Sequence, residues 1–287
     1  AIIFGFGFVT VKIGFNSGFS PSLLTMLRMC IACAVLFPFF YKSIIKTTKS
    51  ELKHGLIAGI FLITGFLLQA IGVQLTVISN SAFLTTTNVI MVPFISWMIL
   101  KKHPKIAVFF SIALGFAGIA ILTRAFDANI HFNLGDILCL LSAVCFALQI
   151  SYTEYAAKKV NTSSFLFVEL AAGAVISALF FFITDSKSLG QITNLPAGLL
   201  SSLWLGAACT GFAFWAQTIS QKVISSSSTV LILSMQAVFA SLFSVLLGFE
   251  NFQYTLALGG GIIMLSIILL ELSNRIGSKK KLPLQKP

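Results

Sequence analysis

The chain has 287 residues, of which 57% are apolar and only 9% are charged, and its mean hydropathy is +0.99. Soluble domains carry about 25% charged residues, so this composition excludes an ordinary soluble protein and indicates helices that lie in lipid. The formal net charge of +11 would also suit a nucleic-acid partner. However, the basic residues lie at the ends of apolar segments, where they set orientation and meet anionic lipid headgroups. We therefore expect no nucleic-acid binding.

Ten apolar segments follow one another along the chain. Each is close to the roughly 17–25 residues that cross a hydrocarbon layer about 30 Å thick, which predicts an all-α integral membrane protein with ten transmembrane helices. The first segment is already apolar at Ala1, so we expect a few residues, including an initiator methionine, to precede it. The predicted spans are 1–17, 22–41, 55–75, 81–100, 105–123, 135–156, 163–183, 197–219, 227–248 and 253–272.

The basic residues are distributed unevenly between the two ends of these spans. Fifteen of the nineteen lysines and arginines lie in alternate connections or in the C-terminal tail, whereas the other connections hold only Arg124 and Lys187. Because short basic connections stay on the cytoplasmic side, this pattern predicts that both termini are cytoplasmic. The fifteen residues are Lys42, Lys46, Lys49, Lys53, Lys101, Lys102, Lys105, Lys158, Lys159, Lys222, Arg275, Lys279, Lys280, Lys281 and Lys286.

The chain divides near Ala125 into two similar blocks of five spans. In the first block Gln74 and a Ser/Asn-rich turn precede an apolar segment, and Gln221 and a serine-rich turn do the same 147 residues later. Such turns supply helix N-caps. Any tight interhelical turn can look like this, but the matching order of long and short connections favours a repeat. The expected units are a first repeat at 1–124, a second repeat at 125–274 and a basic cytoplasmic tail at 275–287.

An odd number of spans in each block has a geometric consequence. The second block must enter the membrane from the opposite side, so the two repeats are inverted. Inverted repeats place a binding site near the midplane, where the halves meet, and let one half rock against the other. The pattern therefore predicts a transporter architecture.

Polar side chains within spans are costly in lipid and usually face the protein interior or a wet cavity. Thr85 and Asn88 share one helical face of the fourth span, and Asn88 and Gln236 both fall near mid-span. The alternative is that such amides hold helices together through hydrogen bonds. Trp215 is the aromatic side chain that we expect to stack on a substrate. The predicted substrate-binding residues are Thr85, Asn88, Gln149, Trp215, Gln236 and Arg28.

Two ionisable side chains lie deeper in spans than the rest. Arg28 is able to hold an anionic substrate group or to pair with a carboxylate for structure. Glu169 is the only carboxylate well inside a span, and it lies seven residues after Thr162, as Arg28 lies seven residues after Pro21. Because desolvation favours the protonated form of a carboxylate, Glu169 is predicted to couple transport to protons. The alternative is a structural partner for a lysine or for backbone donors.

Other short patterns indicate packing. Gly55 and Gly59 have the small-xxx-small spacing that lets helices approach closely. The five cysteines all lie in predicted spans. Cys30 and Cys33 form a Cys-x-x-Cys pattern, but apolar surroundings make such thiols inert. We therefore expect neither a metal nor a cofactor.

Short motifs follow one another along the chain. In the first half they are Phe6-Gly7-Phe8 leading to Lys12, Pro21 followed by Arg28, and Gln74 with Ser79-Asn80-Ser81-Ala82 before Pro93. In the second half they are Gly135-Asp136, Ser225 to Ser228, and Gly248-Phe249-Glu250. On these residues the chain resembles EamA-type members of the drug/metabolite transporter superfamily over nearly its whole length. Two positions depart from that pattern. Lys101-Lys102-His103 replaces an acidic residue often found after the fourth span, and Phe146 replaces a tryptophan. These departures affect what the resemblance implies about the substrate, and they do not affect the fold that it implies.

The resemblance implies a carrier in the bacterial inner membrane, often an exporter of amino acids or related compounds. With the inverted repeats, it predicts a secondary active transporter that works by alternating access, with proton coupling or exchange. The chain has no Gly-x-x-x-x-Gly-Lys-[Ser/Thr] loop for ATP. A small-molecule substrate and the lipid bilayer are the expected partners, and a homodimer is the assembly to test.

Two other classes of function remain as alternatives. A passive facilitator or channel is compatible with inverted repeats, although no filter-like run is present. An integral-membrane enzyme is disfavoured because His54, His103 and His131 lie far apart in the sequence and no acidic cluster suits a metal.

Overall fold

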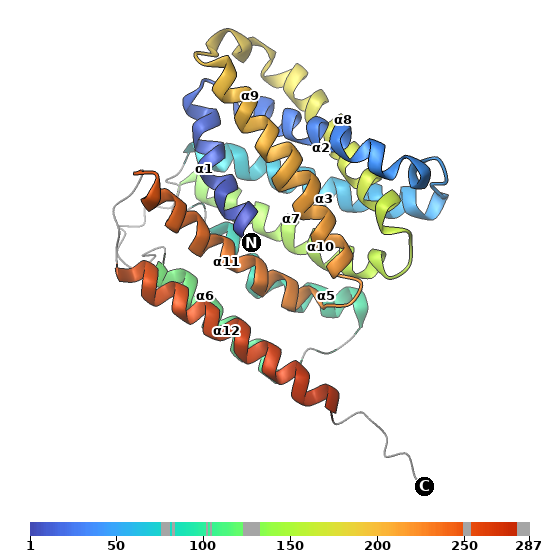
Figure 1. Cartoon of the computed structure of the whole chain (residues 1–287), viewed down its shortest axis with the longest axis vertical. Coiled ribbons are helices and arrows are strands. Elements are labelled where there is room, and N and C mark those ends of the chain that lie inside the picture. The colour runs from blue at the N-terminus through green and yellow to red at the C-terminus, as the bar shows by residue number, and fades with distance from the viewer. Residues whose placement is uncertain are drawn as a thin grey trace.

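The computed structural model shows a bundle of helices (Figure 1) and describes residues 1–75, 81, 84–101, 103, 105–122, 133–248 and 254–279. Within these ranges six helices are long and apolar enough to cross a membrane, and four shorter apolar helices lie at the remaining predicted spans. The all-α membrane class predicted from the sequence is confirmed to this extent. The helices are α1 (Ile2–Asn16), α2 (Pro21–Ile44), α3 (Lys49–Leu75), α5 (Asn88–Leu100), α6 (Ile106–Leu122), α7 (Leu134–Ala157), α8 (Thr162–Thr184), α9 (Leu195–Leu203), α10 (Ala213–Ser220), α11 (Ser226–Leu246) and α12 (Tyr254–Lys279), with a 3-10 helix at Ser186–Gln191 and a π-helix at Trp204–Phe212.

Capping side chains fix where several helices begin. The hydroxyl of Ser225 accepts a hydrogen bond from the backbone N–H of Ser228 at 3.2 Å, which starts α11 as the serine-rich turn predicted. Asn133 and Asp136 form a reciprocal capping box at the start of α7. These bonds matter because the first N–H groups of a helix have no partner within it. The corresponding first-half turn, at residues 76–80, lies outside the described residues, as do residues 123–132, 249–253 and 280–287.

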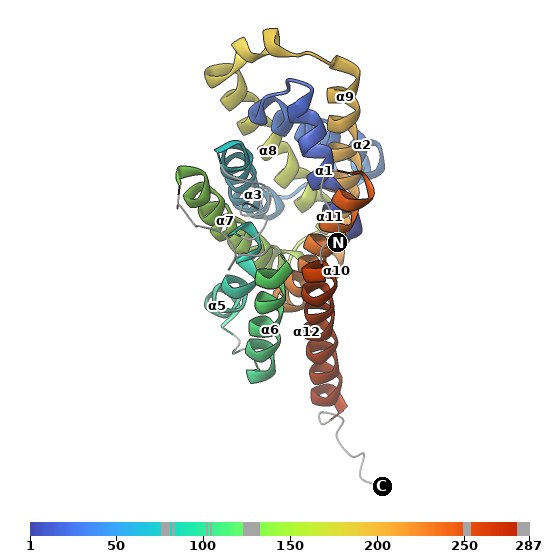
Figure 2. The ribbon, with the colours of Figure 1, turned by 90° about the vertical axis from the view of Figure 1, so that its left-hand side faces the viewer.

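The helices run roughly alongside one another, with one pair at each edge of the bundle. α2 packs against α8 at one edge, and α6 packs against α12 at the other. Figure 2 shows the α6–α12 pair projecting beyond the remaining helices. Between the two edges, α3 packs on α7 and α8, and α1 packs on α11. The central helices α1, α3, α7 and α11 therefore connect the two edge pairs.

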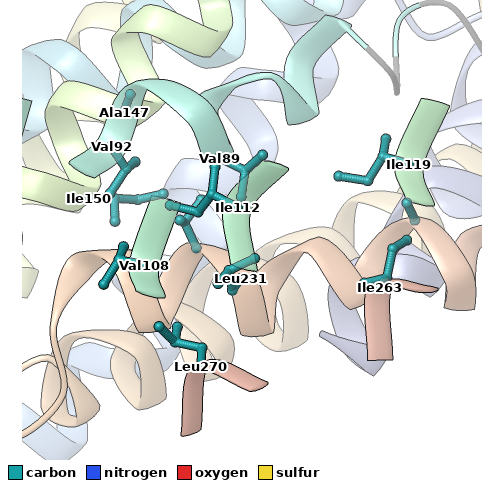
Figure 3. Close-up of a cluster of buried hydrophobic side chains, with 12 residues drawn as sticks. Val89, Val92, Val108, Ile112, Ile119, Ala147, Ile150, Leu231, Ile263 and Leu270 are labelled. Atoms are coloured by element: carbon teal, nitrogen blue, oxygen red, sulfur yellow. The ribbon is translucent and has the colours of Figure 1, made fainter. Parts of the chain in front are cut away.

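A buried apolar cluster joins the α6–α12 pair to the rest (Figure 3). Ile112 of α6, Ile150 of α7 and Leu231 of α11 belong to it, and the fully buried Ile263 of α12 lies near Ile119 of α6. Branched side chains at these positions interlock in well-defined rotamers. This cluster packs α6 and α12, the lower pair of helices in Figure 1, against the rest of the bundle.

Two glycines let main chains of neighbouring helices approach closely. A Cβ atom added to Gly59 of α3 would lie 2.7 Å from the carbonyl oxygen of Glu169 in α8. A Cβ atom added to Gly206 would lie 2.9 Å from the carbonyl oxygen of Arg28 in α2. The close helix contact predicted from the Gly55–Gly59 spacing is therefore confirmed, and Gly206 provides a second one.

These contacts predict that an added methyl group is harmful at two positions and harmless at a third. Gly59→Ala and Gly206→Ala should each lower the free energy of unfolding by about 1–3 kcal/mol, because the new atom forces the helices apart. Gly261→Ala in α12 is the matched control, since an added Cβ meets nothing within 4 Å there. Thermal unfolding in detergent measures the effect. Equal melting temperatures for all three variants would contradict the close approach.

Candidate functional site

A cavity of about 110 Å³ lies at the centre of the bundle, among α1, α2, α3, α5, α7, α10 and α11. Five of the residues singled out from the sequence line it, although they come from four different helices and the short turn before α5. They are Arg28, Thr85, Asn88, Gln149 and Gln236. The structure thus gathers residues that are up to 208 positions apart in the chain around one space.

Arg28 reaches the cavity because of the stripe of α2 on which it lies. Pro21, Leu24, Thr25 and Arg28 follow the spacing of one helical face, and all four are buried. The side chain of Arg28 is 8% exposed. The same face therefore directs its guanidinium inward, away from lipid.

Two contacts hold the guanidinium of Arg28. Its Nε donates to the hydroxyl of Thr210 at 3.0 Å, and its central carbon lies 4.0 Å from the centre of the Phe66 ring. Thr210 belongs to the π-helix Trp204–Phe212, a rare form that often marks functional sites. Within the described part of the chain, no aspartate or glutamate forms an ion pair with Arg28. Of the two alternatives for this residue, pairing with a carboxylate is not observed.

Gln149 links the cavity to the buried carboxylate of Glu169. Its Nε2 lies 2.7 Å from Oε1 of Glu169 and 3.1 Å from the hydroxyl of Thr153. Glu169 is fully buried and does not line the cavity itself. Its second oxygen, Oε2, has no hydrogen-bond partner among the described residues. The neighbour of this carboxylate is thus a cavity amide, in place of the lysine or backbone donors considered above.

Trp215 is placed differently from the other candidates. It packs against Phe212, with ring centres 5.8 Å apart, and it is absent from the cavity lining. Its neighbour Phe214 lines the cavity instead. The two residues are adjacent in α10, so their side chains point in directions about 100° apart around the helix axis. Only one of the two rings therefore faces the centre.

A second cavity of about 220 Å³ adjoins the first and extends toward one end of the bundle. The two share Phe8, Val11, Arg28, Phe66 and Gln69. Farther out, this vestibule is lined by residues at helix ends and by the polar side chains of the first span: Lys12, Asn16, Pro21 and Ser81. The central cavity is therefore approached from the end where α1 finishes and α2 begins.

Polar contacts join the helices at the opposite end. The carboxylate of Glu154, near the end of α7, accepts hydrogen bonds from the backbone N–H and the hydroxyl of Ser226 at 2.6 and 2.7 Å. It also pairs with Lys158 at 2.6 Å, as the i,i+4 spacing allows. Gln221 Nε2 donates to the carbonyl of Ile150 at 2.9 Å. α7 is thus fastened to the start of α11.

Further contacts at this end connect α3 with α7 and α8. Glu51 accepts a hydrogen bond from the backbone N–H of Asn161 at 3.1 Å. Nδ1 of His54 lies 2.6 Å from the hydroxyl of Tyr152. Side chains of α3, α7 and α11 therefore make polar contacts at this end of the bundle, while the vestibule lies at the other.

The family is decided by comparison with known proteins. The EamA-like transporter family matches residues 1–124 and 133–272. The chain belongs to the EamA-like transporter family. The resemblance inferred from the motifs is therefore confirmed, and this EamA protein is a multi-pass membrane protein of a transporter family.

Several relatives agree with the family. An uncharacterized transporter of Archaeoglobus fulgidus is 29% identical over 272 residues, which cover 95% of this chain and 83% of that protein. An uncharacterized transporter of Haemophilus influenzae is 24% identical over 146 residues, covering 50% of this chain and 85% of that protein. Solute carrier family 35 member F2 of Mus musculus is 24% identical over 189 residues, covering 63% of this chain and 49% of that protein. One solved crystal structure shares the fold, with a TM-score of 0.77 and 19% identity over 95% of both chains.

Sequence reasoning missed several residues that line the cavity of this EamA protein. Gln69 and Gln217 contribute amides, and Phe4, Phe66 and Phe146 contribute aromatic walls. The rule that intramembrane amides face the interior would have found both glutamines. The phenylalanines could not be found in that way, because the chain contains 29 of them and most positions suit lipid equally well.

The contact between Arg28 and Thr210 yields a stability prediction for this EamA protein. Thr210→Val should lower the free energy of unfolding by about 1–3 kcal/mol, because the buried Nε donor of a charged group loses its acceptor. Thr218→Val is the control, since the Thr218 hydroxyl bonds only to the Phe214 carbonyl one turn earlier in the helix. Melting temperatures in detergent give the comparison. A larger loss in the control than in Thr210→Val would show that the guanidinium is held in another way.

Proposed function

We propose that this protein is a secondary active transporter that moves a small metabolite, such as an amino acid or a related compound, by alternating access. The observation that carries the proposal is the central cavity, which combines one cation with several amides and is approached from one end of the bundle. Export across a bacterial inner membrane, with both termini in the cytoplasm, is the proposed direction and setting.

The two glycine contacts support an inverted repeat of five helices in each half. An added Cβ at Gly59 would meet the main chain of Glu169 and the side chain of Ala172, and one at Gly206 would meet the main chain of Arg28 and the side chain of Ile31. Gly206 lies 147 positions after Gly59, the same offset as the two glutamine-turn motifs. Glu169 and Ala172 each lie 141 positions after Arg28 and Ile31. One contact is therefore the counterpart of the other.

The packing of whole helices supports the same relation. When each span is exchanged for the span five places away, the α3–α8 contact becomes that of the π-helix Trp204–Phe212 with α2. In the same way α1–α11 becomes α7–α5, and the pairs α2–α8 and α6–α12 map onto themselves. A pseudo-two-fold arrangement of this kind is the basis of alternating access in inverted-repeat transporters.

The two ends of the bundle differ, although the proposed symmetry relates one end to the other. At one end Glu154 binds Ser226 and fastens α7 to α11. By the 147-residue offset, the counterpart of Ser226 is Ser79, which lies outside the described residues, and the counterpart of Ser228 is Ser81, which lines the vestibule. We take the end fastened by Glu154 as the closed side of the proposed transporter and the vestibule as its open side. Exchange of these two states would open the cavity to the opposite side.

Glu169 is the proposed site of proton coupling. Oε1 of Glu169 accepts a hydrogen bond from Nε2 of Gln149, and such a bond is stronger when the carboxylate is charged. Protonation removes the charge from this acceptor and weakens the bond, so the amide of Gln149 becomes free to bind cargo. The position of a side chain that lines the cavity would in this way depend on the proton.

Site-directed labelling tests the inverted arrangement. In a variant without the five native cysteines, single cysteines replace Asn16, Lys46, Lys187 and Lys222, all of which are exposed. Asn16 and Lys187 should react with an impermeant thiol reagent from outside the cell, and Lys46 and Lys222 only after the membrane is opened. Reaction of positions 16 and 46 from the same side would exclude the proposed topology.

Counterflow in proteoliposomes tests the transport mechanism. A melting-temperature screen of amino acids and related metabolites identifies a ligand, since binding to the folded state raises its stability. Labelled ligand should then accumulate transiently above its external concentration when the vesicles contain the unlabelled compound. Equilibration without such an overshoot would indicate a passive facilitator.

The same vesicles test the role of Glu169. An imposed pH gradient should drive uptake of the ligand by the wild type, and Glu169→Gln should abolish this response while counterflow persists, because exchange needs no proton. Glu51→Gln is the control, since that carboxylate caps helices at the closed end. A retained response in Glu169→Gln would remove Glu169 from the coupling mechanism.

A further inference from the structure

We infer that the cargo of the central cavity is an organic anion, with one carboxylate or comparable anionic group on an apolar body and no cationic group. This inference rests on the proposed transport function and narrows its substrate class to compounds related to amino acids that carry no ammonium group. It follows from the charge in the cavity, from the polar atoms left without partners, and from the nature of the walls.

The first observation is an uncompensated positive charge. The guanidinium of Arg28 lines the cavity and is 8% exposed. Nε is bound by Thr210 and one face is covered by Phe66, which leaves the two terminal nitrogens without a hydrogen bond to any described residue. A buried charge without a counter-ion is unfavourable. An anionic ligand would supply the counter-ion and would bind bidentately through those two nitrogens.

The second observation is a neighbouring donor that also lacks a partner. Gln217 lines the same cavity, is 8% exposed, and its Nε2 has no hydrogen-bond partner among the described residues. The other buried atoms in this condition are Oε2 of Glu169 and Oε1 of Gln221, and neither residue lines the cavity. The unsatisfied groups that face the cargo are therefore donors, which require an acceptor such as a carboxylate oxygen.

The third observation concerns what is missing from the lining that the structure describes. No aspartate or glutamate lines the central cavity or the vestibule, whereas Lys12 and Arg28 line the vestibule. The ammonium group of an amino acid would meet only amide oxygens and aromatic faces. The local field therefore attracts anions toward the cavity and gives a zwitterion no full charge with which to pair its ammonium group.

The fourth observation defines the body of the cargo. Phenylalanine rings from both halves form much of the wall: Phe4, Phe8, Phe66, Phe146 and Phe214. Ligand pockets of this type bury apolar surface and use a few polar groups for orientation. An aromatic or branched aliphatic carboxylate matches this combination better than a sugar or a polyamine does.

Three related probes test the inference: 3-phenylpropanoate, its nearly isosteric neutral amide 3-phenylpropanamide, and phenylalanine, which differs from the first by an added ammonium group. Calorimetric titration of the purified wild type should give at least about tenfold tighter binding of 3-phenylpropanoate than of either other probe, as expected for a charge-assisted bond to a buried cation. Equal or tighter binding of the amide or of phenylalanine would overturn the inference. So would the absence of binding by all three at millimolar concentration.

Variants separate charge recognition from general damage. Arg28→Gln should weaken binding of 3-phenylpropanoate by about tenfold or more and leave the amide little changed, and Arg28→Lys should restore part of the preference for the anion. Gln217→Leu should weaken the anion alone. Trp97→Phe, in α5 but absent from the cavity lining, is the control and should leave all three probes unchanged. An undiminished preference for the anion in Arg28→Gln would contradict the assignment.

Counterflow with labelled probes distinguishes the two proposals. Exchange of phenylalanine without binding of 3-phenylpropanoate would retain the transporter and overturn the anionic cargo. Binding of 3-phenylpropanoate that depends on Arg28, without exchange of any labelled probe, would retain the anion site and overturn the transport mechanism.

Discussion

A positive charge in the middle of a lipid-embedded bundle constrains everything packed around it. The guanidinium of Arg28 must be shielded from lipid by protein, because a charge exposed to hydrocarbon is strongly disfavoured. Gly206 allows the π-helix to lie close to the main chain of α2, and this approach puts Thr210 within hydrogen-bond distance of Nε. The ring of Phe66 covers the guanidinium from α3. Three features therefore contribute to the environment of Arg28: the π-helix that carries Thr210, the small residue Gly206 and the ring of Phe66.

The proposed relation between the two halves suggests how the cavity would open to either side of the membrane. Gly59 and Gly206 lie close to the main chains of α8 and α2, and in the proposed inverted repeat these two contacts are equivalent. Equivalent contacts would let a helix pair exchange partners at one end of the bundle while the other end stays packed. Glu154 joins α7 to α11 at one end of the bundle, and the vestibule lies at the other end. In the proposed mechanism these two ends would exchange roles during alternating access.

The polar residues of the centre fall into two groups with separate tasks. Arg28 and Gln217 present donors to the cavity and account for recognition of an acceptor on the cargo. Gln149 lines the cavity and its amide also donates a hydrogen bond to the carboxylate of Glu169. It would therefore link cargo binding to the proposed proton site. Glu169 is fully buried and does not line the cavity, so in the proposed mechanism it acts on the cargo only through that amide. The proposed recognition and coupling residues are therefore different side chains.

The sequence by itself determined the membrane class, the approximate spans, the capped helix start at Ser225, and the close contact at Gly59. It also indicated five of the cavity residues, because an amide, hydroxyl or guanidinium within an apolar span is costly anywhere but the interior. Only the tertiary structure decided that Phe214 and not Trp215 lines the cavity, that Glu169 binds Gln149, and that Glu154 fastens α11. Hydropathy and helical period are local properties of a segment. The rotation of each helix about its axis, and which helices meet, depend on side chains that lie more than a hundred positions apart in the chain.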